Sequence, residues 1–228
     1  MPSSSESTSW EIVHDAAVGR PAAQDAFVRR YEPLVRRYFA GRWRLDRDHE
    51  RVANAAQDVL LRCLSPGGPL TRLDPTRPSG FRAFLYGIVL NAAREHERAE
   101  RRHRGTPLDE ERTAAEVPAD GPTASVLFDR YWAEGLVRRA WELVADRLRS
   151  KRDGELRLAV LRLRYVEDLA PEVIRSQLSL PSVRDVHRLA ATGRYQFRLA
   201  LLGTVAAEYP ELDPAQVEAK CLQLLDLL

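Results

Sequence analysis

The stretch from Phe81 to Arg104 reads FRAFLYGIVLNAAREHERAERRHR, and it changes character halfway along. Its first half has apolar side chains at i, i+3, i+4, i+7 and i+8, which is the spacing of one helix face. These apolar residues are Phe81, Phe84, Leu85, Ile88, Val89 and Ala92. From Arg94 onward only Ala99 is apolar, and no Gly or Pro interrupts the run before Gly105. The pattern predicts one helix that begins inside a core and ends on a charged surface.

The charged half of this helix has two interpretations. Glu97–Arg101 and Glu100–Arg104 are spaced for i,i+4 ion pairs, each worth about 0.2–0.5 kcal/mol at an exposed site. In the first interpretation this half is a solvated helix end, and such pairs are enough to explain its charges. A basic rod with aromatic residues at its base would instead suit contact with a polyanion, and only the rest of the chain can separate the two.

Composition excludes several classes of protein. No apolar run in the 228 residues approaches the ~20 needed to span a bilayer, and MPSSSESTS at the N-terminus does not resemble a signal peptide. We therefore expect a cytoplasmic protein without membrane insertion. Cys63 and Cys221 lie in apolar helical patterns and are interpreted as packed thiols. Because the histidines share no spacing and no phosphate loop or nucleophile setting occurs, we expect a binding protein with no metal, no cofactor and no enzymatic activity.

The net charge of +2 hides segments of opposite sign. A basic cluster consists of Arg36, Arg37, Arg42, Arg44 and Arg47. Residues 109–120 are acidic, with Arg112 as their single basic side chain. This alternation is typical of a protein that touches nucleic acid in some places and avoids or imitates it in others. Lys151 and Lys220 are the only lysines. The arginine excess favours bidentate phosphate or base contacts, or it reflects a GC-rich genome.

No stretch alternates polar and apolar residues between turn signals, so the sequence predicts an all-α protein. We expect two small helical domains joined by an acidic linker. Gly19 is a candidate C-cap for the first helix, and Pro21 suits the first turn of the next. Helices are predicted at 10–18, from 21 through 39, at 50–64 and 81–104, and then at 128–148, 155–166, 171–178 and 183–202. The predicted organisation is a disordered tail (1–9), a first domain (10–104), the linker (105–125), a second domain (126–202) and a helical extension (203–228).

The C-terminal extension has a helix signal of its own. Asp213, Pro214 and Gln216 fit the N-cap, N1 and N3 positions of a helix. The apolar face that follows consists of Val217, Cys221, Leu224, Leu225 and Leu228. Either this helix docks on the second domain or it binds a partner.

Three stretches of the first domain resemble the first domain of a bacterial extracytoplasmic-function sigma factor, of the sigma-70 family. WEIVHDAAVGRPAAQDAFVRRYEPLVRRY is similar to the family's opening helices. VANAAQDVLLRCL resembles the helix that docks on the clamp of the polymerase largest subunit. That resemblance implies contacts with core polymerase from Gln57, Asp58, Leu61 and Arg62.

The third stretch, FRAFLYGIVLNAAREHER, resembles the segment that melts the promoter and reads its minus-ten element. The resemblance implies DNA contacts from Tyr86, Asn91, Arg94, Arg98, Arg101 and Arg102. A melted strand needs stacking surfaces, worth about 1–3 kcal/mol per base, and a cationic path for its backbone. An Asn can both donate and accept at a base edge, and in the family an Asn at this place lies by the pocket for a flipped base. The alternative for Asn91 is a bridging or capping role within the domain.

The second domain resembles the family's minus-thirty-five-reading domain through LRLRYVEDLAPEVIRSQLSLPSVRDVHRLAATGRYQFR. The resemblance implies a recognition helix that starts near Ser182 and contacts DNA through Arg184, Asp185, His187, Arg188 and Arg194. Several positions depart from the family pattern. Arg175 replaces a small Ala, Ser179 replaces the turn Gly, the turn is longer, and Gly193 is expected to interrupt the recognition helix. This helix-turn-helix therefore either binds duplex DNA or is retained for contact with polymerase or a regulator.

The resemblance implies a sigma factor that directs RNA polymerase to promoters and assists melting and initiation. Its partners would be the clamp and flap of core RNA polymerase and promoter DNA, and an anti-sigma factor is left open. The acidic linker would enter a basic channel of the polymerase, or it is a solvated tether. Two alternatives stay open: a helix-turn-helix repressor, and a sigma-like interaction protein that acts as a regulator.

Overall fold

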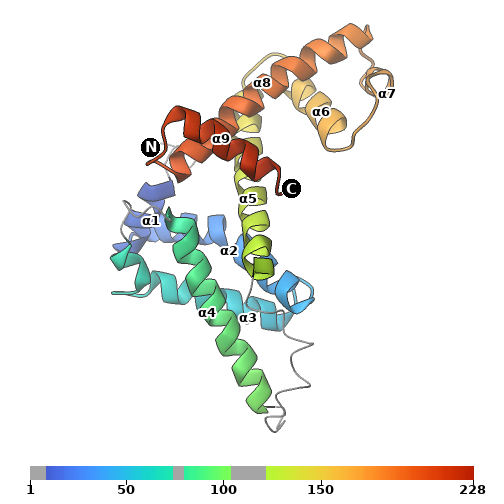
Figure 1. Cartoon of the computed structure of the whole chain (residues 1–228). Coiled ribbons are helices and arrows are strands. Elements are labelled where there is room, and N and C mark those ends of the chain that lie inside the picture. The colour runs from blue at the N-terminus through green and yellow to red at the C-terminus, as the bar shows by residue number, and fades with distance from the viewer. Residues whose placement is uncertain (1–8, 74–79, 104–121) are drawn as a thin grey trace. The chain divides into compact units, whose positions relative to one another are not determined.

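The computed structural model describes residues 9–73, 80–103 and 122–228. Within these ranges the regular elements are helices and none is a strand, which confirms the predicted all-α class. The elements, most of them labelled in Figure 1, are α1 (Ser9–Ala17), α2 (Pro21–Trp43), α3 (Glu50–Leu64), η1 (Pro69–Arg72), α4 (Gly80–His103), α5 (Pro122–Arg149), α6 (Gly154–Tyr165), α7 (Pro171–Gln177), α8 (Val183–Glu208) and α9 (Pro214–Leu225). No helix in the described part combines the length and the apolar character needed to cross a membrane.

The described residues form two compact units. The first contains the residues up to Gly135 together with 207–213 and 223–228, and the second contains 136–206 and 214–222. The division falls inside α5, α8 and α9, whereas the sequence placed its domain limits at 125 and 202. Those limits stay a prediction, because the tail at 1–9 and the acidic linker at 105–125 lie almost entirely outside the described residues.

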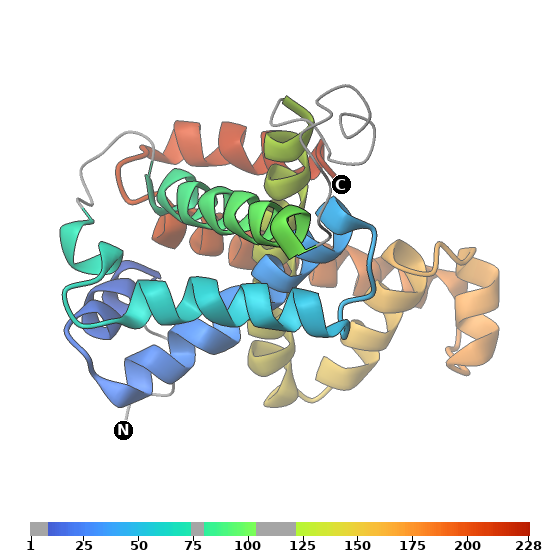
Figure 2. The same cartoon turned by 90° about the horizontal axis from the view of Figure 1, so that it is seen from below.

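The core of the first unit is made by the side chains that the helical spacing predicts. Those of α2 are buried although Pro33 lies inside the helix: Phe27, Tyr31, Leu34, Val35, Tyr38 and Phe39. Those of α3 are buried as well: Val52, Ala55, Val59, Leu60 and Cys63. α3 packs against both α2 and α4, and Figure 2 shows α3 and α4 side by side. Phe81, Leu85, Val89 and Ala92 of α4 complete this core.

The turn between α1 and α2 follows the sequence signals. Gly19 has φ 82°, and its N–H donates to the Ala16 carbonyl at 3.1 Å, while the Arg20 N–H donates to the Asp15 carbonyl at 3.0 Å. These two bonds form a Schellman ending, which needs a left-handed residue where Gly19 stands. Pro21 then occupies the first turn of α2, where its missing N–H would have had no helical partner. Both local predictions are confirmed.

The first half of α5 contributes to the core of the first unit. Phe128 and Trp132 are buried, and the Trp132 ring lies 6.1 Å from the Tyr31 ring in a stacked arrangement. Tyr209, just after α8, is also buried and accepts a hydrogen bond from Trp132 Nε1 at 3.1 Å. Residues from the middle and the end of the chain therefore complete a core that begins at α2. No periodicity in the sequence indicated this association.

The second unit has a small aliphatic core between α6, α7 and the start of α8. Its buried members are Val160, Ile174, Leu180, Val186, Leu189 and Ala190. Gly193 of α8 lies against α6, where a Cβ would stand 2.6 Å from Leu161 Cγ. α8 runs unbroken through this position to Glu208, so the interruption predicted at Gly193 is wrong. Gly193 is a close-approach position between two helices.

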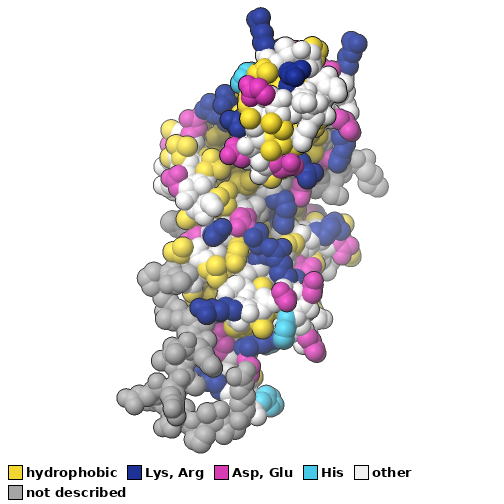
Figure 3. Space-filling view, turned by 90° about the vertical axis from the view of Figure 1, so that its right-hand side faces the viewer, with side chains coloured by type: hydrophobic (Ala, Val, Ile, Leu, Met, Phe, Trp, Pro, Cys, Tyr) yellow, Lys and Arg dark blue, Asp and Glu magenta, His cyan; other side chains and the backbone are white. Residues whose placement is uncertain are grey.

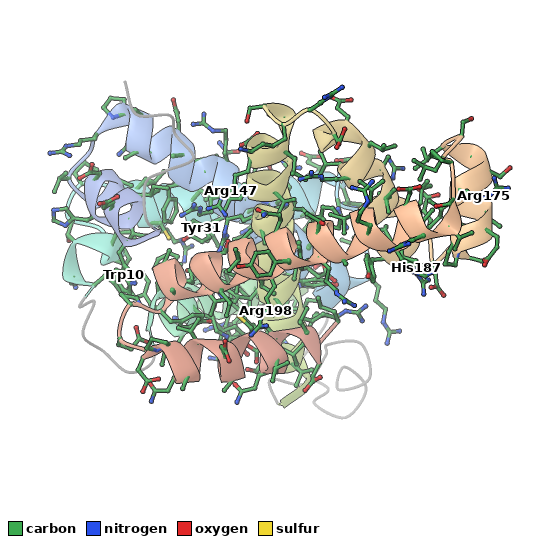
Figure 4. All side chains as sticks on the ribbon, turned by 90° about the horizontal axis from the view of Figure 1, so that it is seen from above. Trp10, Tyr31, Arg147, Arg175, His187 and Arg198 are labelled. Atoms are coloured by element: carbon green, nitrogen blue, oxygen red, sulfur yellow. The ribbon has the colours of Figure 1, made fainter. Side chains whose placement is uncertain are left out.

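α9 begins at Pro214, as the N1 signal predicts, and is only partly covered. Val217, Cys221 and Leu224 are buried, whereas Leu225 and Leu228 are exposed. Arg198 of α8 donates to Glu218 of α9 at 3.0 Å, and Figure 4 shows Arg198 pointing toward α9. The extension is therefore joined to the rest of the chain by both apolar and charged contacts.

Candidate nucleic-acid interface

The glutamates in the charged half of α4 turn toward α2 and α3. Glu95 accepts from Arg62 at 2.5 Å, and Glu100 forms an ion pair with Arg51. Glu97 is bonded to Arg42 of α2. The predicted pair Glu97–Arg101 is therefore wrong, since a buried partner on another helix takes the carboxylate. For Glu100–Arg104 only Glu100 is described, and it pairs with α3.

Glu97 and Arg42 form a buried ion pair that fixes the roll of α4. Arg42 Nε donates to Glu97 Oε1 at 2.7 Å and Nη2 donates to Oε2 at 3.2 Å, with the two residues 2% and 7% exposed. Trp43 Nε1 donates to the same Oε1 at 2.9 Å, and Arg42 Nη1 donates to the Tyr38 hydroxyl at 3.4 Å. Bidentate geometry and full hydrogen bonding are what make a buried pair tolerable. With Glu97 held inward, the opposite face of α4 must point outward.

The outward face of α4 carries most of the predicted minus-ten residues. At about 100° per residue, Arg94, Arg98, Arg101 and Arg102 all lie within roughly 80° of Asn91 around the helix axis. Asn91, Arg98, Arg101 and Arg102 are exposed, and Arg94 is half-buried. Arg98 Nε donates to the Arg94 carbonyl at 3.2 Å, which keeps its side chain along the helix. We call these five residues the α4 stripe.

Phe84, Gly87 and Ile88 adjoin the α4 stripe on its N-terminal side. The sequence placed Phe84 and Ile88 in the core, but both are half-buried, and Phe84 leans on Phe81 with ring centroids 6.1 Å apart. A Cβ added at Gly87 would meet no heavy atom within 4 Å, so packing does not require glycine there. A bare backbone beside a half-exposed aromatic ring gives a flat base room to approach. The signal for Phe84 and Gly87 in the sequence was their position seven and four residues before Asn91, which places them on the same side of a helix.

Tyr86 lies apart from the α4 stripe, about 140° away from Asn91 around the helix. It is half-buried, with its ring 5.1 Å from Phe128 and 6.3 Å from Tyr38. The Arg82 guanidinium lies 5.9 Å from the Tyr86 ring. The structure therefore brings five of the six predicted minus-ten residues together and separates the sixth.

The basic cluster at residues 36–47 is mostly used inside the first unit. Arg42 is buried with Glu97, Arg36 bonds to Glu32 at 2.9 Å, and Arg37 forms an ion pair with Glu134. Arg44 and Arg47 are exposed. A count of arginines along the chain thus overstated the charge that this region presents.

The predicted polymerase-docking residues share the outer side of α3. Gln57 is exposed, and Leu61 in the last turn of α3 is 58% exposed. Asp58 lies 2.7 Å from His96 Nε2, and Arg62 is bonded to Glu95. Two of the four residues are therefore tied to α4, and two are turned toward solvent.

The start of α8 presents the predicted minus-thirty-five residues on one side. Arg184, His187, Arg188 and Arg194 are exposed, and Figure 4 shows His187 on the side of α8. Ala191 and Tyr195 fall in the same row at i+3 and i+4 spacing, and Tyr195 is 58% exposed. In Figure 3 this end of the second unit is at the top, where basic, acidic and apolar side chains lie together. Tyr195 is a candidate that the sequence prediction missed, although its spacing from Arg188 could have indicated it.

Asp185 has a local structural role at the beginning of α8. The Ser182 hydroxyl donates to Asp185 Oδ2 at 2.7 Å and accepts from the Asp185 N–H at 3.2 Å, a reciprocal cap. Arg188 donates to the other carboxylate oxygen at 3.1 Å. The Ser182 hydrogen bond, followed by that from Arg188, lowers the pKa of Asp185 below its usual value. A DNA contact from this carboxylate would have to compete with both bonds.

The unusual turn before α8 keeps the geometry that a glycine would give. Ser179 has φ 51°, and the Leu180 N–H donates to the Arg175 carbonyl at 2.9 Å, as in a Schellman ending. Leu180 is buried in the aliphatic core of the second unit. Arg175, where a small residue was expected for packing, is exposed on α7 (Figure 4). Neither departure disturbs the packing of the helix-turn-helix.

Among the described residues no group of three His, Cys, Asp or Glu side chains is placed to hold a metal ion. Burial raises the pKa of the Cys63 thiol to about 12, so this cysteine is a protonated core side chain at neutral pH. The arrangement offers arginines, amides and aromatic rings, which bind and position a ligand.

A scan against protein-family models, a search of curated proteins and a search of solved structures found no match to this chain.

Proposed function

We propose that this chain is a sigma factor, a subunit that directs bacterial RNA polymerase to promoters and assists their melting. The α4 stripe carries the proposal. Asn91 stands where a half-exposed aromatic residue gives way to a row of arginines, while Glu95, Glu97 and Glu100 are paired with Arg62, Arg42 and Arg51. Unpaired bases need the first feature and their phosphates need the second.

In the proposed mechanism the chain acts only by binding polymerase and DNA. Gln57 and Leu61 on α3 dock on core polymerase, and the second unit holds upstream duplex through Arg184, His187 and Arg188. The α4 stripe then holds the separated strand, with a base beside Phe84 and Asn91 and the backbone along Arg98 and Arg102. Melting is favoured because the stripe binds the open strand and not the paired duplex.

In vitro transcription tests the proposal. Full-length protein and core RNA polymerase are incubated with a library of genomic fragments, and run-off products are sequenced. We expect initiation at discrete sites that core enzyme alone does not use. Initiation from no site would overturn the proposal.

Asn91→Ala separates the proposed base contact from a structural role. Because Asn91 is exposed and the buried face of α4 does not use it, the variant should bind core polymerase normally. The variant should form about tenfold fewer open complexes, because one hydrogen-bonded contact to a base edge is lost. Equal loss of core binding and open complexes would show that Asn91 is structural.

A helix-turn-helix repressor is the second candidate, because the unbroken helix α8 presents several basic side chains on one side. A repressor binds its duplex site tightly without polymerase. A sigma factor of the proposed kind shows specific binding only together with core enzyme. Gel-shift experiments on the same fragments, with and without core polymerase, distinguish the two.

A further inference from the structure

The α5 segment 124–135 is held on the first unit by two aromatic residues one turn apart. Phe128 and Trp132 are 0% and 2% exposed. The Phe128 ring lies 5.1 Å from Tyr86 and 5.7 Å from Tyr38, and the Trp132 ring stacks on Tyr31 with 17° between the planes. Side chains at i and i+4 that enter an aromatic surface are the usual way in which a helix occupies a groove.

Charged contacts surround these rings. Asp129 forms an ion pair with Arg82 of α4, and Glu134 forms one with Arg37 of α2. The Arg37 guanidinium also lies 4.9 Å above the Tyr131 ring. These groups are partly exposed, so each contact is weak in water, and their contribution falls as salt is added. The segment is thus held by a buried aromatic centre within a salt-sensitive rim.

Tyr209 fixes the centre of this contact from the far end of the chain. It is 8% exposed, and its hydroxyl accepts from Trp132 Nε1 at 3.1 Å. An indole N–H can only donate a hydrogen bond. If the Tyr209 hydroxyl is removed, the buried Trp132 N–H loses this acceptor, which destabilises the contact. The stretch after α8 therefore helps to decide whether α5 stays on the aromatic surface.

We propose that the α5 segment 124–135 is a clasp that covers Tyr86, and that Tyr209 is its lock. This inference rests on the proposed function. While the clasp is closed, the α4 stripe is available and the Tyr86 ring is covered by Phe128. When it opens, Tyr86 and Tyr38 become a second stacking surface for unpaired bases, on a different side of α4 from the stripe. The apparent affinity for single-stranded nucleic acid is then reduced by the fraction of molecules in which the clasp is open.

Tyr209→Phe tests the lock with little change in volume. Loss of one buried hydrogen-bond acceptor should increase the open population by about fivefold to a hundredfold. Hydrogen exchange of the full-length variant should be faster by that factor in 124–135 and unchanged in α3. Tyr165→Phe, which removes an exposed hydroxyl in the second unit, is the matched control and should change neither region.

The second arm measures anisotropy of a fluorescent single-stranded oligonucleotide. Tyr209→Phe should bind it more tightly, by no more than the factor found in hydrogen exchange, and Tyr209→Phe with Tyr86→Ala should lose the gain. Unchanged exchange in 124–135, or a gain that survives Tyr86→Ala, would overturn the clasp. The exchange arm contains neither DNA nor polymerase. Failure of the clasp therefore shows as an unchanged exchange rate, and failure of the proposed function as an absence of run-off products.

Discussion

α4 and α8 each present a row of arginines, but different interactions orient the two rows. In α4 Glu97 turns inward and meets the buried Arg42, so a desolvated ion pair orients the charged half of the helix. In α8 apolar contacts set the roll, with Gly193 against Leu161 and a reciprocal cap at the first turn. A buried ion pair fails abruptly when one partner is removed, whereas apolar packing responds to volume. The two faces should therefore respond to different changes.

Glu97→Ala should be the most damaging of these changes. It leaves the Arg42 guanidinium buried without its carboxylate, which costs about 3–5 kcal/mol. Urea unfolding followed by circular dichroism measures the loss. Glu95→Ala is the matched control, because Glu95 is exposed in its pair with Arg62 and such pairs contribute about 0–1 kcal/mol. Similar losses for both variants would contradict the assignment of α4 orientation to the buried pair.

The first unit should lose stability in alkaline solution. Burial raises the pKa of Cys63 and of Tyr209 to about 12, from ordinary values of 9.0 and 10.0. The folded first unit keeps protons that the unfolded chain releases, so its stability is full below pH 9.0 and falls as the pH rises toward 12. From about pH 8 to about pH 10.5 the loss should be about 2–3 kcal/mol.

Asp185 shifts in the opposite sense, because its pKa is lowered in the folded protein. The contribution of Asp185 at the start of α8 is present at neutral pH and is lost in acid, as the pH falls through the ordinary pKa toward the lowered one.

The alkaline loss of stability in the first unit is measured by urea unfolding of Trp141→Phe, which leaves Trp10, Trp43 and Trp132 as fluorescence reporters of that unit. A first unit equally stable at about pH 8 and about pH 10.5 would contradict the burial of both groups.

Gly193→Ala should loosen the second unit and leave the first unchanged. A Cβ there would lie 2.6 to 2.8 Å from three side-chain atoms of Leu161, and such overpacking costs about 1–3 kcal/mol. Gly203→Ala in the same helix meets nothing within 4 Å, so it should stabilise α8 by up to about 1 kcal/mol through helix propensity. Thermal unfolding of the pair measures the difference. A stabilising Gly193→Ala would show that α6 and α8 do not touch there.

Ser182→Ala should have the smallest effect. Loss of the N-cap bond to the Asp185 N–H costs about 1 kcal/mol and should fray the first turn of α8. Hydrogen exchange of the amides at 183–186 measures the fraying. Ser176→Ala, on the exposed side of α7, is the control and should leave these amides unchanged. Equal protection of these amides in the two variants would show that the Ser182 side chain does not stabilise the first turn of α8.

The sequence predicted what local patterns determine. The apolar spacing of α2 and α3 identified their buried residues, Glu50–Leu64 was predicted with its observed limits, and Gly19 and Pro21 marked a helix end and a helix start. These features depend on residues a few positions apart. Of the site, the residues from Asn91 to Arg102 were implied by the resemblance, and helical spacing places them on one side of α4.

The rest depends on contacts between distant parts of the chain. Glu97 pairs with Arg42, 55 positions away, so the i,i+4 spacing of Glu97 and Arg101 gave a wrong prediction. Trp132 donates a hydrogen bond to Tyr209, 77 positions away. Gly193 looked like a helix breaker because nothing nearby in the sequence shows that Leu161 packs on it. Tyr86 lies near the stripe in sequence and away from it around the helix.

The most direct test of the central claim is permanganate reactivity of promoter thymines. A fragment that supports run-off transcription is incubated with core polymerase and the full-length protein. We predict reactive thymines with the wild type and with Arg29→Ala, an exposed arginine outside the stripe, and their loss when Arg98, Arg101 and Arg102 are replaced together by alanine. The same reactivity with the triple variant, or none with the wild type, would contradict the claim that the α4 stripe holds the melted strand.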